Sequence, residues 1–237
     1  MRLIIDLILL FIMVLCIWEG YKHGLIRSIL GLSAIILSLV ISNVISGSLA
    51  RELVPAVEPF VGGYIDSDKM NSMVLERLGY ADTDKSLTDI LEEDSSLQYD
   101  YAYWCMRETG FFGDASEDLA EDTVNYAQKN GCSLTDAVIT VVCNTAAYVI
   151  CETIIFIMII VLASALLDLF NLNIRLPNAD IIDDVGGAAV GFIKGFLICV
   201  LICWLLGFLG LLLGKGASDK GLIGFFLAFR FITRTLI

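Results

Sequence analysis

Four polar residues interrupt long apolar stretches of the sequence: Asp6, Asn144, Glu152 and Lys194. A polar or charged side chain is costly inside an apolar membrane helix, so these positions are the candidates for a transport path. Lys194 lies nine residues into its apolar run. Its amine either snorkels to the membrane interface or pairs with Glu152 or Asp6, and we expect snorkelling.

Residues for other chemistry are scarce. His23 is the single histidine, which argues against a His-based zinc site and a catalytic triad within the chain. Cys199 and Cys203 share a helix face, a spacing that suits a soft metal, but buried packing thiols are far commoner. The sequence contains no phosphate loop, dinucleotide fingerprint or nucleophile elbow. We therefore predict no catalytic residue, no cofactor and no metal, and no enzymatic activity.

The elements that carry these residues are apolar enough to cross a membrane. Hydrophobic residues make up 57% of the chain and charged residues 18%, against about 45–50% and 25% in soluble domains. Four apolar runs predict an all-α integral membrane protein with four transmembrane helices near residues 3–20, 25–46, 153–170 and 187–213. In a signal peptide the basic residues come before the apolar core and an A-x-A-like cleavage site follows it. Here the basic residues come after the first apolar run and no such site follows, so we expect a retained span.

Two stripes of small residues predict close helix packing. Gly187, Gly191 and Gly195 recur every four residues in the last span, a spacing that lets another helix approach backbone to backbone. Ala34, Ser38, Ser42 and Ser46 recur in the same way in the second span. Two interpretations of this second stripe stay open: it faces the glycine stripe, or its hydroxyls bond back to the preceding turn. Expected partners are the lipid bilayer and, at the glycine stripe, other membrane proteins or a second copy.

Acidic residues concentrate between the second and third spans. Residues 51–133 carry 18 acidic and 6 basic side chains, whereas the rest of the chain carries nine of each. This segment predicts a soluble helical insert, with helices over 67–80, 86–94 and 116–129. Six aromatic residues cluster between them, as the core of a small cap or as a belt at the headgroups: Tyr99, Tyr101, Tyr103, Trp104, Phe111 and Phe112. The chain has no basic patch for nucleic acid.

Residues 134–213 form the third predicted segment. Ser133 and Asp136 resemble a helix cap, and no Pro or Gly interrupts the chain from there to Phe170. We expect one long helix, tilted or interfacial in its first part, with Glu152 where the third span begins. A loop over 171–184 then precedes the fourth span. The divisions are therefore 1–50, 51–133, 134–213 and an amphipathic interfacial tail over 214–237 that carries Arg230 and Arg234.

Two motifs in this order resemble a known family. Asp6 followed by Gly20-x-x-x-Gly24-x-x-Arg27 is similar to the N-terminal signature of the colicin V production (CvpA) family of bacterial inner-membrane proteins. Asp183-x-Val-x-Gly187-x-x-x-Gly191-x-x-Lys194-Gly195 resembles its second signature, with Lys194 where an arginine is common. The resemblance covers residues 1–50 and about 150–237, and leaves out the insert.

The resemblance implies a multi-pass protein of the bacterial cytoplasmic membrane, linked to toxin production and envelope maintenance, with no agreed molecular activity. The absence of sites favours a non-enzymatic scaffold or assembly factor. A transporter or channel subunit with Glu152 and Lys194 in a polar path is the alternative. An intramembrane enzyme is a third class, for which no nucleophile and base are evident.

Basic residues set the expected orientation. Lys22, Arg27 and Arg175 lie in the short loops, which the positive-inside rule places in the cytoplasm. The insert is then outside, and family members that carry an extracytoplasmic protease agree with this. Five basic residues near the chain ends oppose it: Arg2, Lys215, Lys220, Arg230 and Arg234. Outside the cell, Cys105 and Cys132 of the insert would meet an oxidising compartment and are a candidate disulfide.

Overall fold

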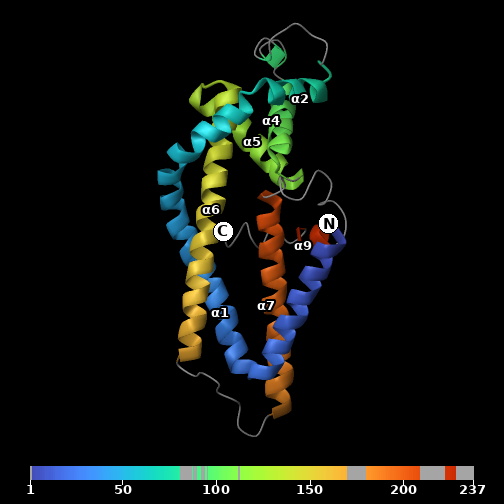
Figure 1. Cartoon of the computed structure of the whole chain (residues 1–237), viewed down its shortest axis with the longest axis vertical. Helices are drawn as coiled ribbons and strands as arrows, with labels where there is room; N and C mark the ends of the chain where they lie inside the picture. The colour runs from blue at the N-terminus through green and yellow to red at the C-terminus, as the bar shows by residue number, and fades with distance from the viewer. Residues whose placement is uncertain are drawn as a thin grey trace. The chain divides into compact units, whose positions relative to one another are not determined.

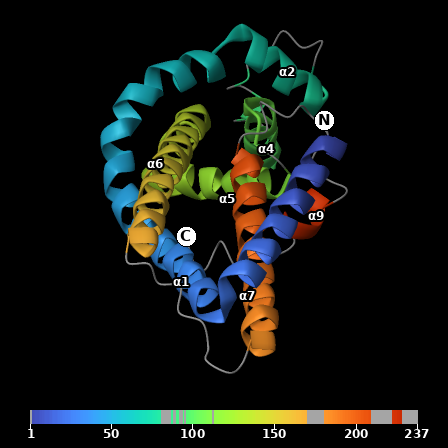
Figure 2. The ribbon, with the colours of Figure 1, turned by 60° about the horizontal axis from the view of Figure 1, so that its bottom comes forward.

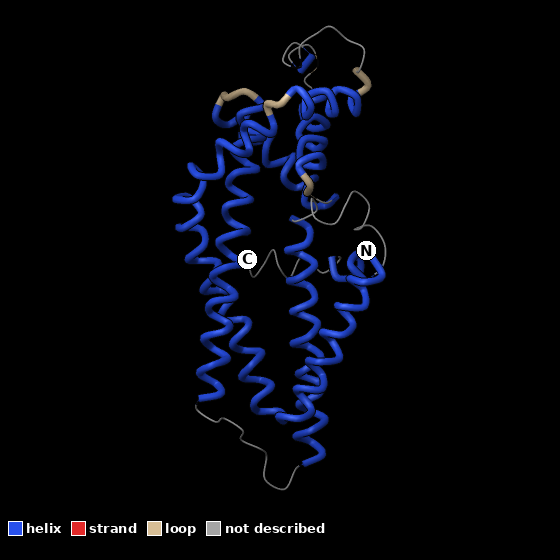
Figure 3. Tube along the Cα trace, viewed as in Figure 1, coloured by secondary structure: helices blue, strands red, loops and turns tan. Residues whose placement is uncertain are grey.

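A computed structural model describes residues 2–80, 87, 90–91, 94, 96–111, 113–169, 180–208 and 222–227. Over these residues the regular structure is entirely helical (Figure 3), so the predicted all-α fold is confirmed. The chain divides into two compact units. The membrane unit contains Met1–Gly47, Cys151–Leu206 and helix α9 (Leu222–Leu227), and the cap unit contains Ser48–Ile150 and the last residues of α7.

Helix α1 (Arg2–Ile65) is broken at one residue. Gly24 has φ 83° and ψ 176°, a backbone conformation that only glycine adopts without strain. The expected connection over residues 20–27 is therefore reduced to this single non-helical position. Within the membrane unit, a first arm (residues 2–23) and a second arm (residues 25–47) diverge from the break (Figures 1 and 2).

The arms pack on helices α6 (Leu134–Leu169) and α7 (Asp180–Phe208). Leu9 of the first arm is fully buried in a cluster with Val200 and Phe226, which brings α7 and α9 together. The second arm contributes Ile35 and Leu39 to a separate cluster around Leu197. α7 thus contacts both arms.

Among the described residues, three helices are long and apolar enough to cross a membrane: Leu3–Ile65, Leu134–Leu169 and Ile181–Phe208. The predicted uninterrupted helix after Ser133 is confirmed, because α6 extends without a break from Leu134 to Leu169. At its start, the Asp136 N–H donates to the Ser133 hydroxyl at 3.1 Å. The helix that follows Gly24 continues past residue 46, the predicted end of the second span, to Ile65, through Pro55 and Pro59. One predicted limit is wrong. α7 begins at Asp180, so residues 180–184 are helical and not part of a loop.

The cap unit is built on α2 (Asp68–Leu78), α4 (Leu97–Thr109) and α5 (Gly113–Asn130). The hydroxyl of Ser67 accepts the Met70 N–H and so caps the start of α2. Tyr101, Met106 and Val138 are fully buried in the core of this unit. The cap is therefore a packed helical domain with an apolar interior.

α4 is the element that the sequence pattern missed. The aromatic cluster assigned to the space between helices lies mostly on α4 itself, since Tyr99, Tyr101, Tyr103 and Trp104 are all within it. Tyr101 is core, whereas Tyr99 is 41% exposed. The expected helix over 86–94 is described only at residues 87, 90 and 91, which are helical, and at Asp94. Of the tail, residues 222–227 are described, and Arg230 and Arg234 lie outside the described residues.

Candidate functional site

The break in α1 is held by a carboxylate from α7. The N–H of Leu25, the first residue of the second arm, donates to Asp183 Oδ1 at 2.8 Å. A Cβ atom at Gly24 would collide with the same carboxylate. Asp183 is 1% exposed, so it acts as a buried N-cap supplied by another helix. The two predicted motifs therefore meet here, Gly24 and Leu25 from the first and Asp183 from the second.

The glycine stripe of α7 lies against the first arm of α1, backbone to backbone. A Cβ atom at Gly187 would collide with the carbonyl oxygen of Gly20, and one at Gly191 with that of Cys16. At Gly195 the same atom would lie 3.0 Å from the Cβ of Cys16. The contacts run in opposite order along the two helices, so the helices are antiparallel. In this structure the chain's own first arm covers the stripe, which was the expected contact for a second copy or another membrane protein.

Two ion pairs connect the helices near the break. Lys194 Nζ donates to Glu19 Oε2 at 3.0 Å, which joins α7 to the first arm. Arg27 pairs with Asp168, which joins the second arm to α6. Glu152 and Asp6 were the expected partners of Lys194, and this expectation is wrong, whereas snorkelling of the amine to the membrane interface stays a prediction. The antiparallel packing brings Glu19 beside Lys194, whereas Asp6 lies farther along the first arm, where its Oδ1 accepts the Leu222 N–H at 3.2 Å.

A cavity of about 200 Å³ lies beside both ion pairs. Three helices of the membrane unit form its wall: α1, α6 and α7. Its polar lining is made of Glu19, His23, Arg27, Ser28, Ser164, Asp168 and Lys194. In each ion pair the cation is the less exposed member: Arg27 is 19% and Lys194 20% exposed, against 67% for Asp168 and 52% for Glu19.

Glu152 is bound by the serine stripe of the second arm. Its two carboxyl oxygens lie 2.6 Å from the hydroxyls of Ser42 and Ser46, and the residue is 2% exposed. The predicted pairing of the serine and glycine stripes is therefore wrong, because this end of the serine stripe faces α6. The second interpretation holds at Ser38, whose hydroxyl donates to the Ala34 carbonyl at 2.6 Å.

Glu152 does not line the cavity that contains Lys194. The two charges proposed for one polar path therefore lie in separate environments of the membrane unit. The residues that the sequence analysis missed are Glu19 and Asp168, the acidic partners of the two cations. Each of these acids lies at the end of an apolar run, which was the signal available in the sequence. Which cation each acid pairs with depends on the register between helices, and the apolar runs alone do not reveal that register.

The cysteines are all free thiols in the structure. Cys199 and Cys203 are fully buried, and among the described residues no three His, Cys, Asp or Glu side chains form a metal-binding group. Cys105 is 1% exposed on α4, and burial raises the pKa of its thiol to about 12. The disulfide expected between Cys105 and Cys132 is not formed in this structure, and a thiol with so high a pKa reacts slowly at neutral pH.

Comparison with known proteins identifies one family. The family model of the colicin V production protein matches residues 5–75, which confirms the resemblance over this range. The match includes Asp6, Gly20, Gly24 and Arg27, and it extends beyond residue 50, where the resemblance was expected to pause. The second motif lies outside the matched residues. No curated protein and no solved structure is significantly similar to the chain.

Proposed function

We propose that this chain, a membrane protein whose residues 5–75 match the colicin V production family, is a four-span scaffold or assembly factor. The family resemblance connects it with toxin production and maintenance of the bacterial envelope. In this proposal the break at Gly24 divides α1 into two spans, and α6 and α7 supply the third and fourth.

Helix lengths support four spans. At 1.5 Å per residue, the first arm, the second arm, the end of α6 from Cys151 and α7 are each about 28–44 Å long. The hydrocarbon core of a bilayer is about 30 Å thick. Large apolar side chains point away from the protein on these helices, for example Leu3 (75% exposed), Val161 (62%) and Val185 (62%). Such a surface suits contact with lipid.

The observation that carries the scaffold proposal is the interlocking of the helices near the break. Asp183 caps the second arm, Lys194 holds the first arm, and Arg27 holds α6. Backbone contacts at Gly187 and Gly191 add a close-packed seam to these polar contacts. A bundle fixed in this way is built to keep one shape, which suits a platform for other envelope proteins.

A transporter or channel subunit is the second candidate, because a cavity reaches Lys194. Against it, Glu152 lies outside this cavity, and the two cations in its wall are held in ion pairs that join helices. The two candidates differ in what they require: a transporter needs an open cavity, whereas a scaffold needs an intact bundle.

Complementation of a deletion strain separates them, with toxin secretion and detergent sensitivity of the cells as readouts. Gly31→Leu adds a side chain to the cavity wall: its Cβ would be in ordinary contact, 3.7 Å from Lys194 Nζ, and the rest of the side chain would take up space in the cavity. The scaffold proposal predicts that the Gly31→Leu variant restores toxin secretion and detergent resistance, and that the Gly191→Leu variant, which breaks the seam, restores neither. If a stably expressed Gly31→Leu variant restored neither, transport would be favoured instead.

A further inference from the structure

The cavity beside the break has an asymmetric distribution of charge. Its two cations, Arg27 and Lys194, are about four-fifths buried, whereas their acidic partners are more than half exposed. An exposed carboxylate can turn to water at little cost, because ion pairs of this kind contribute little net free energy. The cations are fixed in the wall, and the acids occupy places that another anion can take.

The two cations face the same space. The Lys194 ammonium lies 3.7 Å from the position of a Cβ on Gly31, which has no side chain to block it. Arg27 lies four residues before Gly31 and so is on the same face of the second arm, one turn away. Both side chains line the same cavity of about 200 Å³. Gly31 adds no side chain to this part of the cavity wall.

The chemistry of this wall matches a phosphate group. A guanidinium binds phosphate oxygens through two parallel hydrogen bonds, and an ammonium adds a point charge. The His23 ring and the Ser164 hydroxyl also line the cavity and offer further polar contacts. The cavity lies close to the break in α1 and to the last residues of α6, which is the level of the headgroups when these helices span a membrane.

We propose that this cavity is a phosphate-binding site, in which Arg27 and Lys194 bind a phosphate or phosphodiester group in exchange for Asp168 and Glu19. The phosphate belongs either to a lipid headgroup or to a soluble ion. Basic cavities between membrane helices bind anionic headgroups in this way. The exchange opens only the two ion pairs; the Asp183 cap and the glycine seam, on which the scaffold proposal also rests, stay in place.

The test uses the purified full chain and two probes. Inorganic phosphate is titrated at constant ionic strength while the melting temperature is followed. Separately, native mass spectrometry counts lipids retained from micelles doped with phosphatidylglycerol or with phosphatidylcholine. Stabilisation by inorganic phosphate alone identifies a soluble ion, and selective retention of phosphatidylglycerol identifies a headgroup. Either result supports the site, and the absence of both overturns it.

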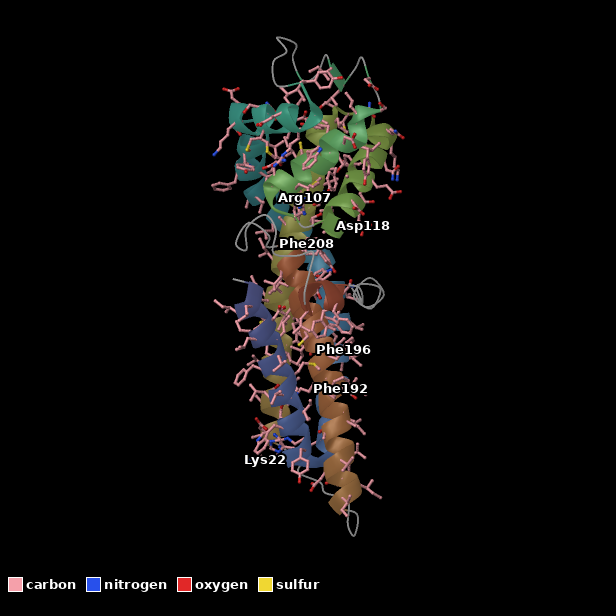
Figure 4. All side chains as sticks on the ribbon, turned by 90° about the vertical axis from the view of Figure 1, so that its right-hand side faces the viewer. Lys22, Arg107, Asp118, Phe192, Phe196 and Phe208 are labelled. Atoms are coloured by element: carbon pink, nitrogen blue, oxygen red, sulfur yellow. The ribbon has the colours of Figure 1, made fainter. Side chains whose placement is uncertain are left out.

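Variants of the two cations test whether they bind the phosphate. Arg27→Gln and Lys194→Gln should each weaken binding about tenfold, since each removes a charge-assisted contact. Lys22→Gln is the matched control, because Lys22 is an exposed residue of the first arm (Figure 4) five positions before Arg27 and does not line the cavity. The substitution removes the same charge. An equal loss of affinity in Lys22→Gln would reduce the effect to net charge and overturn the proposal.

Glu19→Gln and Asp168→Asn test the exchange itself and keep both cations. Each removes a competing carboxylate, so the affinity for the probe should rise several-fold. These two variants test the proposal even if Arg27→Gln fails to fold. Unchanged or weaker binding in both variants would mean that the ion pairs serve only to hold the helices together.

Discussion

Gly24 and Asp183 occupy one site: the carboxylate of Asp183 stands where a side chain on residue 24 would be, and it accepts the N–H of Leu25 at 2.8 Å. The break exposes N–H groups at the start of the second arm, and an N–H group that is buried in the protein needs a partner there. Asp183 satisfies one of them from α7. The break in α1 and the position of α7 are therefore stabilised together.

Substitutions at this contact should have graded effects. Asp183→Asn keeps an oxygen acceptor for Leu25 and should retain most of the stability, whereas Asp183→Ala should cost about 1 kcal/mol or more, as loss of a helix cap does. Gly24→Ala should cost more than either, because it adds a collision to a positive φ. Thermal unfolding in detergent measures the order. Equal stability of Gly24→Ala and the unmodified chain would contradict it.

The glycine seam provides a second prediction. Gly191→Leu places a side chain against the backbone of Cys16 and Ile17, so the first arm should separate from α7. We expect loss of the monodisperse folded species in size-exclusion chromatography and faster proteolysis.

Gly47→Leu is the control for this seam, because a Cβ at Gly47 meets nothing within 4 Å. It makes the same change of residue type on an open face of α1. Equal behaviour of the two variants would mean that Gly191 has no special packing role.

The long apolar helices could be predicted from the sequence, because they depend on the length and apolar character of continuous runs. The small-residue spacing also indicated a close helix contact. The partners of Lys194, Asp183 and Glu152 could not be predicted, because they depend on the register of helices far apart in the chain. α4 escaped for another reason: its tyrosines at 99, 101 and 103 alternate, and alternation hides a helical period.

Glu152 should tolerate an amide but not the loss of its polar group. In Glu152→Gln, the amide oxygen accepts the Ser42 hydroxyl and the amide nitrogen donates to Ser46, so both contacts persist. Glu152→Ala loses both and should lower the free energy of unfolding by about 1–3 kcal/mol. Unfolding of the two variants in the same detergent compares them. A similar loss in both would show that the negative charge, and not hydrogen bonding, is required.

The cap unit should lose stability in alkali. Burial raises the pKa of Cys105 from its ordinary 9.0 to about 12, and burial also raises the pKa of Tyr101. Above pH 9 the unfolded thiol has released its proton while the folded thiol keeps it. The unfolded state then binds fewer protons, so the free energy of unfolding falls as pH rises, whereas below pH 9 this contribution is present in full.

Cys105→Ala isolates the thiol. Its free energy of unfolding should fall less steeply between pH 9 and 11 than that of the unmodified chain, with a difference of up to about 1.4 kcal/mol per pH unit. Denaturant unfolding at several pH values measures both slopes. Parallel curves for the two proteins would contradict the role of burial at Cys105.

Cys132 should report the side of the membrane on which the cap unit lies. It is partly exposed, whereas the other six cysteines are buried: Cys16, Cys105, Cys143, Cys151, Cys199 and Cys203. A membrane-impermeant maleimide should therefore react with Cys132 alone.

If the short connections are cytoplasmic, intact cells should be labelled, and Cys132→Ser should abolish the signal while Cys105→Ser keeps it. Labelling only after permeabilisation would place the cap in the cytoplasm. Labelling that needs prior reduction would reveal a disulfide to Cys105, which requires the cap to open because that sulfur is buried in its core.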